Sequence, residues 1–255
     1  LRFPLHRRLP APATSPGFTI FKPLKGRDAF TEKCLRSWLQ QDYAGRVQIL
    51  FGVASDADPV CDLMRQLLEQ FPGTDAQLVI CPEQPGANAK VSTLIQLQPH
   101  ARHELLIVSD ADVLVPSDLL TNLAAALAPK DLGLVSCVYR LAHTPTTAMR
   151  WEAVAVNADF WSQVLQATAL KPMDFALGAV MALRRQALDD IGGFSTLADC
   201  LADDYQLGHR IRHKGWRVEL CPLVVECWDP PQGWIAVWHH QLRWARTIRV
   251  SQPLP

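Results

Sequence analysis

Apolar and polar positions alternate in two different periods along the first half of the chain. Short apolar runs predict buried strands over Phe18–Leu24, Val47–Val53, Leu78–Cys81 and Leu105–Ser109. Apolar residues spaced three or four apart predict helices over Ala29–Gln40, Pro59–Phe71 and Ala89–Leu97. Strands that alternate with helices form right-handed βαβ units, so we expect an α/β fold with a mostly parallel central sheet.

The second half of the chain is less regular, although elements are still distinguishable. Apolar runs predict strands over Leu132–Tyr139, Val180–Leu183 and Val218–Val225. Helical spacing predicts helices over Thr147–Gln166, Leu201–Lys214 and Trp234–Val250. We therefore divide the chain into a proline-rich arm or linker over 1–17, one domain over 18–250 with halves over 18–115 and 116–250, and a short tail over 251–255.

The composition indicates which binding partners and which cellular compartment are compatible with this chain. Lys plus Arg and Asp plus Glu both number 25, so no overall positive field favours nucleic acid. The seven cysteines are odd in number and form no C-x-x-C pair, which favours a reducing compartment over a disulfide framework or a zinc site. No apolar run is long enough to span a bilayer. Because the chain starts with Leu and stops after a basic helix, we interpret it as a fragment cut before a membrane segment.

Paired acidic residues follow two of the predicted strands. Asp56 and Asp58 come after the second strand, and Asp110 and Asp112 come directly after the strand LLIVS. Ligands of parallel sheets sit beyond the carboxyl ends of the strands. Two carboxylates there can share a divalent cation with the oxygens of a diphosphate. A D-x-D pattern is also frequent by chance and often precedes a helix, but its place after a buried strand favours the metal.

Three further groups of residues have both a functional and a structural interpretation. Asp203 and Asp204 open a predicted helix, where negative charge is stabilised by the helix dipole, but one of them could be a general base. Arg243 could hold a diphosphate through forked hydrogen bonds or could be solvated. The loop with Gly86, Asn88 and Lys90 suits anion binding at a helix start, although it lacks the spacing of a Walker loop.

The order of these groups carries a family resemblance that no single group carries. The ordered motifs are Lys22-Pro-Leu-Lys-Gly26, Phe51-Gly-Val with Asp58-Pro59, Gly86-x-Asn88-x-Lys90, Ser109-Asp-Ala-Asp112, Ile191-Gly-Gly193, Ala202-Asp-Asp-Tyr205 and Arg243-Trp244. Across residues 18–250 the chain resembles the ceramide glucosyltransferase family, which consists of inverting glycosyltransferases with the GT-A fold. The segments LADDYQLG and HHQLRWARTIR are most similar to the bacterial branch associated with hopanoid glycosylation.

The resemblance implies a role for each motif residue. It implies that Asp56 and Asp58 hold the uridine of a UDP-sugar donor, and that Lys25, Gly86, Asn88, Lys90 and Asp110 also lie in the donor site. Asp110 and Asp112 match the motif that binds Mg²⁺ or Mn²⁺. Asp204 matches the catalytic base, and Arg243-Trp244 match the end of the Q-x-x-R-W motif that grips the diphosphate. Two departures stand out, since Asp203 replaces the usual Glu and His240 replaces the usual Gln.

By this resemblance, the half over 18–115 binds the donor and the half over 116–250 binds the acceptor and carries catalysis. We expect transfer of the sugar to the hydroxyl of a membrane lipid, hopanoid or ceramide-like, at the cytoplasmic face of a bacterial inner membrane. The alternatives are the catalytic domain of a processive polysaccharide synthase, which shares the D-x-D and Arg-Trp features, and a non-catalytic lipid-binding module of the same fold. The second alternative predicts loss of the charged motifs, whereas Asp112, Asp204 and Arg243 are all present.

The last predicted helix has a candidate membrane-facing side. Its apolar side consists of Trp234, Trp238, Leu242, Ala245 and Ile248. Arg246 and Arg249 bring positive charge to the same helix, and tryptophan with arginine suits the headgroup region of a bilayer. We expect Trp244 to pack on the core. For Trp234 and Trp238, packing on the core and contact with a membrane remain equally supported.

Overall fold

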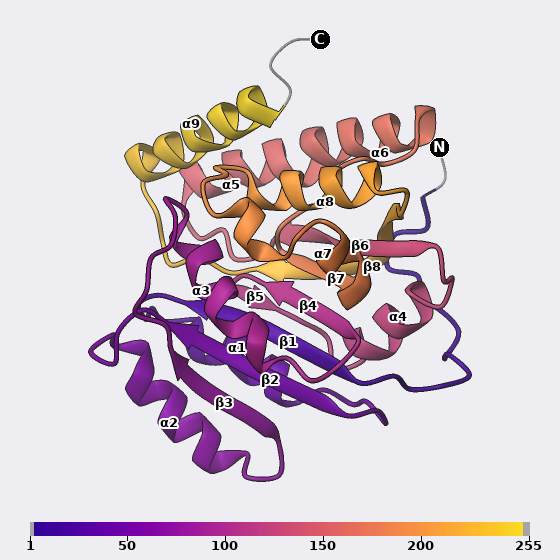
Figure 1. Cartoon of the computed structure of the whole chain (residues 1–255). Helices are drawn as coiled ribbons and strands as arrows, with labels where there is room; N and C mark the ends of the chain where they lie inside the picture. Colours follow the sequence, from indigo (N-terminus) through magenta and orange to yellow (C-terminus); the bar gives the residue numbers. More distant parts are fainter. Residues whose placement is uncertain (1–2, 252–255) are drawn as a thin grey trace.

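The computed structural model describes residues 3–251 and contains one continuous sheet that runs through both halves of the chain (Figure 1). The strands of the first half are β1 (Phe18–Leu24), β2 (Val47–Val53), β3 (Asp75–Ile80), β4 (Leu105–Ser109) and β5 (Val113–Leu114). The strands of the second half are β6 (Leu132–Leu141), β7 (Val180–Arg184) and β8 (Arg217–Cys227). In the sheet their order is β3-β2-β1-β4-β7-β6-β8-β5.

The pairing of the strands differs between the two halves. β3, β2, β1 and β4 are all parallel, as the alternation of strands and helices predicted. β7 is antiparallel to both of its neighbours, β4 and β6, whereas β6 and β8 are parallel and β5 is antiparallel to β8. The expected parallel arrangement therefore holds for β3, β2, β1 and β4, and among the remaining pairs for β6 with β8. This is the mixed α/β arrangement of the expected GT-A fold.

The helices mostly lie where the periodicity placed them. In the first half they are α1 (Thr31–Leu39), α2 (Val60–Gln70), α3 (Ala89–Leu97) and α4 (Leu119–Ala126). In the second half they are α5 (Thr147–Val154), α6 (Trp161–Leu170), α7 (Arg185–Asp190), α8 (Asp203–His213) and α9 (Trp234–Ser251). Short 3₁₀ turns η1 (Gln98–His100) and η3 (Phe194–Leu197) complete the set. Figure 1 shows α5, α6, α8 and α9 gathered on one side of the molecule, with α2 at the far end.

Several boundaries differ from the prediction. The single helix expected over Thr147–Gln166 is α5 and α6 joined by a π-helical segment, η2 (Ala155–Phe160), and it extends to Leu170. β3 starts at Asp75, before the apolar run that predicted it, because its register with β2 continues to the polar residue pair Gln48 and Asp75. β5, α4 and α7 were not predicted; β5 has two residues and α7 has six, too few to show a period.

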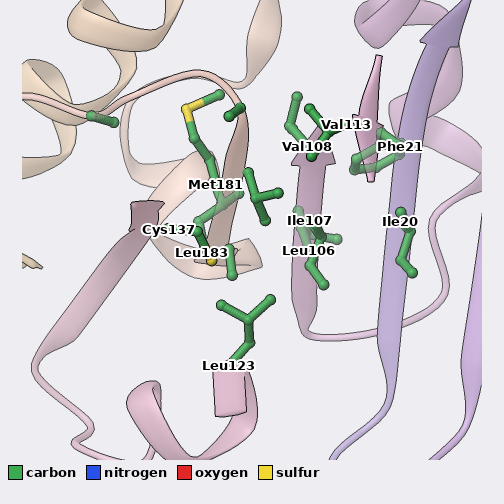
Figure 2. Packing of buried hydrophobic residues seen from close by; sticks show 14 of the residues in the cluster. Ile20, Phe21, Leu106, Ile107, Val108, Val113, Leu123, Cys137, Met181 and Leu183 are labelled. Atoms are coloured by element: carbon green, nitrogen blue, oxygen red, sulfur yellow. The ribbon is translucent and has the colours of Figure 1, made fainter. Parts of the chain in front are cut away.

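One hydrophobic core joins strands from both halves of the chain (Figure 2). β1 contributes Ile20 and Phe21, and β4 contributes Leu106, Ile107 and Val108. From the second half Cys137 of β6 and Met181 and Leu183 of β7 pack into the same cluster. These side chains are at most 1% exposed, so the halves are not separately packed bodies. The acidic loops therefore extend from a sheet whose strands share one closely packed core.

The amino-terminal arm is attached to this body. The backbone N–H of His6 donates to the carbonyl of Pro222 (2.8 Å). Leu9 N–H donates to Oδ1 of Asn122 (2.8 Å), and Arg8 pairs with Asp118 at 2.5 Å. Of the two sequence interpretations of residues 1–17, the described part from Phe3 onward fits an arm packed along α4 and β8 and does not fit a free linker. Of the predicted tail over 251–255, Ser251 is the last residue of α9, and residues 252–255 lie outside the described residues.

Among residues 3–251, no helix combines the length and the apolar character needed to cross a membrane.

Candidate active site

The candidate site lies at the edge of the sheet where the parallel strands β1, β2 and β4 end. Because these strands are neighbours, the loops that follow them meet at one edge. The loops hold Lys25 after β1, Asp56 and Asp58 after β2, and Asp110 and Asp112 after β4. The loop after β3 adds Gly86 and Asn88, and α8 brings Asp203 and Asp204 from the second half.

The D-x-D pair contains one paired and one poorly compensated carboxylate. Oδ1 of Asp110 lies 2.6 Å from Nζ of Lys90. The Asp112 carboxyl is half-buried, and burial, helped by Asp110 and Asp229, raises its pKa to about 7. Its backbone is fixed, since its carbonyl accepts the N–H of Trp228 (3.0 Å) where β5 pairs with β8. The two carboxyl groups are therefore held at a fixed turn, where an added positive charge would favour the ionised form of Asp112.

The buried Lys22 forms hydrogen bonds to the D-x-D turn. The side chain of Lys22 is fully buried, and its ammonium donates to the carbonyl of Asp110 and to Oγ of Ser109 (3.3 Å). Burial lowers the pKa of Lys22 to about 8, although Asp112 and Asp110 act in the opposite direction. Sequence reasoning did not assign Lys22 to the site. A lone charged residue within an otherwise apolar strand was the available sign.

The loop with Gly86 and Asn88 connects the first half of the chain to the second half. Asn88 caps α3 by accepting the N–H of Val91 (3.2 Å), and its Nδ2 donates to the carbonyl of Cys200 (2.8 Å) and to Asp203 (3.3 Å). Gly86 permits this approach, because a Cβ there would lie 2.5 Å from the carbonyl oxygen of Ala198. The loop expected to bind anions thus also positions the acidic start of α8.

Lys90 lies between the two acidic motifs. Besides Asp110, its Nζ lies 3.5 Å from Oδ2 of Asp203. Burial acts to lower the pKa of Lys90, but the carboxylates of Asp110 and Asp203 outweigh burial and raise it. This ammonium therefore stays charged and partly neutralises both motifs.

Asp204 has the environment of a general base. It lies at the start of α8, where its Oδ1 accepts the N–H of Tyr205 (2.8 Å), so the predicted helix start is confirmed. Burial, and then the neighbouring Asp203, raises its pKa to about 6. Its other oxygen faces Gly178, where a Cβ would lie 3.0 Å away. Gly178 was missed in the sequence because it belongs to no motif.

The residues expected to hold uridine have different surroundings. Both carboxylate oxygens of Asp58 lie 3.0 Å from the N–H of Gly26, and Oδ1 also accepts the N–H of Val60 (2.9 Å). Asp58 thereby secures the loop that carries the exposed Lys25. Asp56 is exposed and pairs with Arg65 of α2. Asp58 is thus bonded to the loop that carries Lys25, whereas the side chain of Asp56 is directed to Arg65 of α2.

The last helix carries Arg243, which is exposed. Burial raises the pKa of Asp229, while the charges of His240 and Arg243 act to lower it. Asp229 follows β8, and its charge adds to the effect of burial in raising the pKa of Asp112. Trp244 packs on Phe160 and Tyr139, with ring centroids 5.6 and 6.5 Å apart, as expected for a core residue. Asp229 was also missed in the sequence.

A Rossmann-like sheet with a D-x-D turn and an acidic helix start at the ends of its strands is the arrangement of a GT-A glycosyltransferase domain. The chain belongs to glycosyl transferase family 21, whose family model matches residues 2–255.

Two groups of relatives agree with this assignment. The chain is 24% identical to ceramide glucosyltransferase 3 of Caenorhabditis elegans over 224 residues, which cover 85% of this chain and 47% of the relative. It is 25% identical to β-monoglucosyldiacylglycerol synthase of Trichormus variabilis over 246 residues, which cover 95% of this chain and 51% of the relative. The chain therefore spans about half the length of these curated relatives.

Solved structures share the fold. A mannosyltransferase from Pyrobaculum calidifontis, solved with GDP-mannose and Mn²⁺, superimposes with a TM-score of 0.71 at 26% identity and covers 95% of this chain and 67% of its own. The glucosyl-3-phosphoglycerate synthase of Mycobacterium tuberculosis superimposes with a TM-score of 0.54 at 14% identity, over 94% of this chain and 81% of its own. The second likeness shows the fold alone.

Proposed function

We propose that this chain transfers a sugar from a UDP-sugar to the hydroxyl group of a membrane lipid, with inversion at the anomeric carbon. The observation that carries the proposal is the contact of Lys90 with both acidic motifs, 2.6 Å from Asp110 and 3.5 Å from Asp203. Through this contact the D-x-D turn lies next to the start of α8, which carries the candidate base Asp204. Family membership supports the same activity.

The carboxylates of Asp110 and Asp112 fit a divalent cation. Hard oxygen ligands at a charge-rich turn suit Mg²⁺ or Mn²⁺, which take one or two carboxylates together with substrate phosphates. Within residues 3–251 no group of three or more His, Cys, Asp or Glu side chains is arranged to hold a metal, so the remaining ligands would come from diphosphate and water. When bound, the cation supplies charge that offsets the negative charge of the leaving diphosphate.

The protein groups then have distinct tasks. Asp204, with a pKa of about 6, is deprotonated at neutral pH and takes the proton of the acceptor hydroxyl. The hydroxyl oxygen forms its bond to the anomeric carbon as the bond to the diphosphate breaks on the opposite face. Arg243 donates forked hydrogen bonds to the leaving diphosphate, and Trp244 anchors its helix. Because the divalent cation and Arg243 offset the negative charge on the leaving diphosphate, no second carboxyl group is needed to protonate it. A single carboxylate base therefore suffices.

The remaining donor contacts follow from the same edge of the sheet. Lys25 and Asp58 would flank the nucleoside, with Asp56 at its outer side. Gly86, Asn88 and Lys90 would line the diphosphate next to Asp110. Lys25 and Lys90 bring positive charge to this path.

We also propose that the acceptor is reached at a membrane surface, on the cytoplasmic leaflet. The exposed apolar side chains of α5 and α9 gather around the pair Trp151 and Trp234, whose rings lie 6.2 Å apart. We define the membrane patch as Trp151, Val154, Trp234, Ile235 and Trp238. Trp238 is 59% exposed and so is not a core residue. Aromatic side chains of this kind, with Arg246 and Arg249 on the same helix, suit a bilayer interface.

The experiment that tests the function is a product screen by mass spectrometry. UDP-glucose, UDP-galactose, UDP-N-acetylglucosamine and GDP-mannose are each offered with vesicles that contain ceramide, diacylglycerol or a hopanoid. We expect a hexosyl lipid from a UDP donor only, with the inverted anomeric configuration, and none from Asp204→Asn. Elongating, water-soluble glycan would instead support a polysaccharide synthase. Retained configuration, or no product from any pair, would contradict the proposal.

A further inference from the structure

Glu152 is a buried carboxylate that none of the motifs contains. It lies in α5, is 5% exposed, and uses one oxygen to accept two hydrogen bonds from α9. Nδ1 of His240 lies 2.6 Å from Oε1, and Nε2 of Gln241 lies 2.8 Å from the same atom. Burial acts to raise the pKa of Glu152, but these hydrogen bonds outweigh burial and lower it. A buried charge is costly unless it is paired, so this contact fixes the two helices together.

Other contacts between α9 and the α5–η2 segment are apolar or aromatic, and they include the pair Trp151 and Trp234. Val237 is the fully buried residue of α9 within the described part of the chain, and it packs with Ala148 and Met149 of α5. Farther along, Trp244 packs on Phe160 and Tyr139. The rotation of α9 about its own axis therefore depends strongly on the polar contact with Glu152.

The π-helical segment η2 allows α5 and its continuation to meet α9 twice. Glu152 and Phe160 are eight residues apart, which in an α-helix would leave them about 80° apart around the axis. The wider turn of η2, over Ala155–Phe160, rotates the chain less per residue and reduces that angle. Glu152 and Phe160 can then both face α9, where they contact His240 and Trp244.

Arg243 is placed by these two contacts. It lies between them in sequence, three residues after His240 and one before Trp244. His240 and Arg243 are both electrostatic neighbours of Asp229, which follows directly on Trp228, the residue whose N–H is bonded to Asp112. A rotation of α9 would therefore change where the guanidinium of Arg243 lies relative to Asp229.

We infer that Glu152 is a positioning residue that sets the rotation of α9 through His240 and Gln241 and so directs Arg243 at the diphosphate of the donor. This inference rests on the proposed function for the role of Arg243. It also explains the departure at the first position of the Q-x-x-R-W motif. Nδ1 of His240 is held by Glu152, so this ring nitrogen is not free to bind a substrate.

The first test measures hydrogen exchange in the free protein. Glu152→Ala removes the acceptor, whereas Glu152→Gln keeps an oxygen at the same place. We expect faster exchange over Trp234–Ser251 in Glu152→Ala, with β1 and β4 unchanged, and near wild-type exchange in Glu152→Gln. Unchanged exchange of α9 in Glu152→Ala would overturn the inference, whatever the activity of the chain.

The second test is a double-mutant cycle on donor turnover. We expect Glu152→Ala to lower kcat/KM for the donor by about tenfold or more and Glu152→Gln by less than about threefold. If Glu152 acts through Arg243, Glu152→Ala adds little further loss to Arg243→Ala. Val237→Ala is the matched control, because it loosens the same helix pair without touching the polar contact.

The outcomes separate this inference from the proposed function. Additive losses for Glu152→Ala and Arg243→Ala would overturn the role of Glu152. The same would follow if Val237→Ala, combined with Arg243→Ala, were as far from additive as Glu152→Ala. A wild-type protein that turns over no donor would instead contradict the proposed function. In that case the exchange experiment still decides whether Glu152 holds α9.

Discussion

The ammonium nitrogen of Lys90 lies 2.6 Å from Oδ1 of Asp110, at the point where the first half of the chain meets the second. The same nitrogen is 3.5 Å from Asp203, so one positive charge serves two acidic motifs that are distant in sequence. The proposed base, Asp204, is next to Asp203 and senses this charge, which lowers its pKa against the larger effect of burial.

A pH profile tests this connection. Asp204 must be deprotonated to accept a proton, so the rate should fall as the pH falls through about 6. Removal of the positive charge in Lys90→Gln should raise the pKa of Asp204 and move this acid limb to higher pH. Arg217→Gln, which breaks exposed ion pairs with Asp131 and Glu219, is the control and should leave the limb in place. A limb that does not move in Lys90→Gln would contradict the coupling.

The two adjacent aspartates should differ in importance. Asp204→Asn keeps the shape of the side chain and the helix start but removes the proton acceptor, so turnover should fall by about 10²-fold or more. Donor binding, measured by calorimetry, should largely persist. Asp203→Asn should be milder, since Asp203 contacts Lys90 and Asn88 and is not the base. If the two variants ranked the other way, the base would be Asp203.

The cation requirement can be tested without an acceptor. UDP binding by the wild type should depend on Mg²⁺ or Mn²⁺ and be abolished by chelator. In Asp112→Asn the metal-dependent part of UDP binding should be lost while thermal unfolding shows an intact fold. Full transfer activity in excess chelator would show that Asp110 and Asp112 do not act through a metal.

The membrane patch can be tested by co-sedimentation with liposomes. Binding should strengthen with anionic lipid and weaken with salt, because Arg246 and Arg249 lie on the same helix as the tryptophans. Replacement of Trp151 and Trp234 by Ser should reduce binding with little effect on stability, since both side chains are at least half exposed. Ile80→Ser, at an exposed apolar position on β3, is the matched control. Equal binding to neutral and anionic vesicles would remove the electrostatic contribution.

Much of the first half could be predicted because each strand and helix carries its own period. β1, β2 and β4 are buried on both faces, so their apolar runs are continuous and their ends are marked by the acidic loops that form the site. The second half was harder. β7 runs antiparallel between β4 and β6, and nothing in its short apolar run specifies that direction.

The residues that were missed act through tertiary contacts. Asp229 and Glu152 belong to no motif, and Lys22 stands in a motif but was not assigned to the site. The effect of each depends on which distant groups the fold places beside it. The charge of Glu152 is stabilised by residues 88 and 89 positions away, a separation that periodicity does not register. Motif order identified the acidic groups, but the way in which Lys90 joins them required the structure.

The close approach of Gly178 to Asp204 has a practical consequence. A methyl group added at Gly178 would lie 3.0 Å from a carboxylate oxygen of Asp204. Gly178→Ala should therefore displace the base without removing its charge, and should slow transfer while the donor still binds. Such a variant would be a natural candidate for trapping donor and acceptor together in a crystal. Among related sequences, the size of the residue at this position would also show which of them can still carry out the reaction.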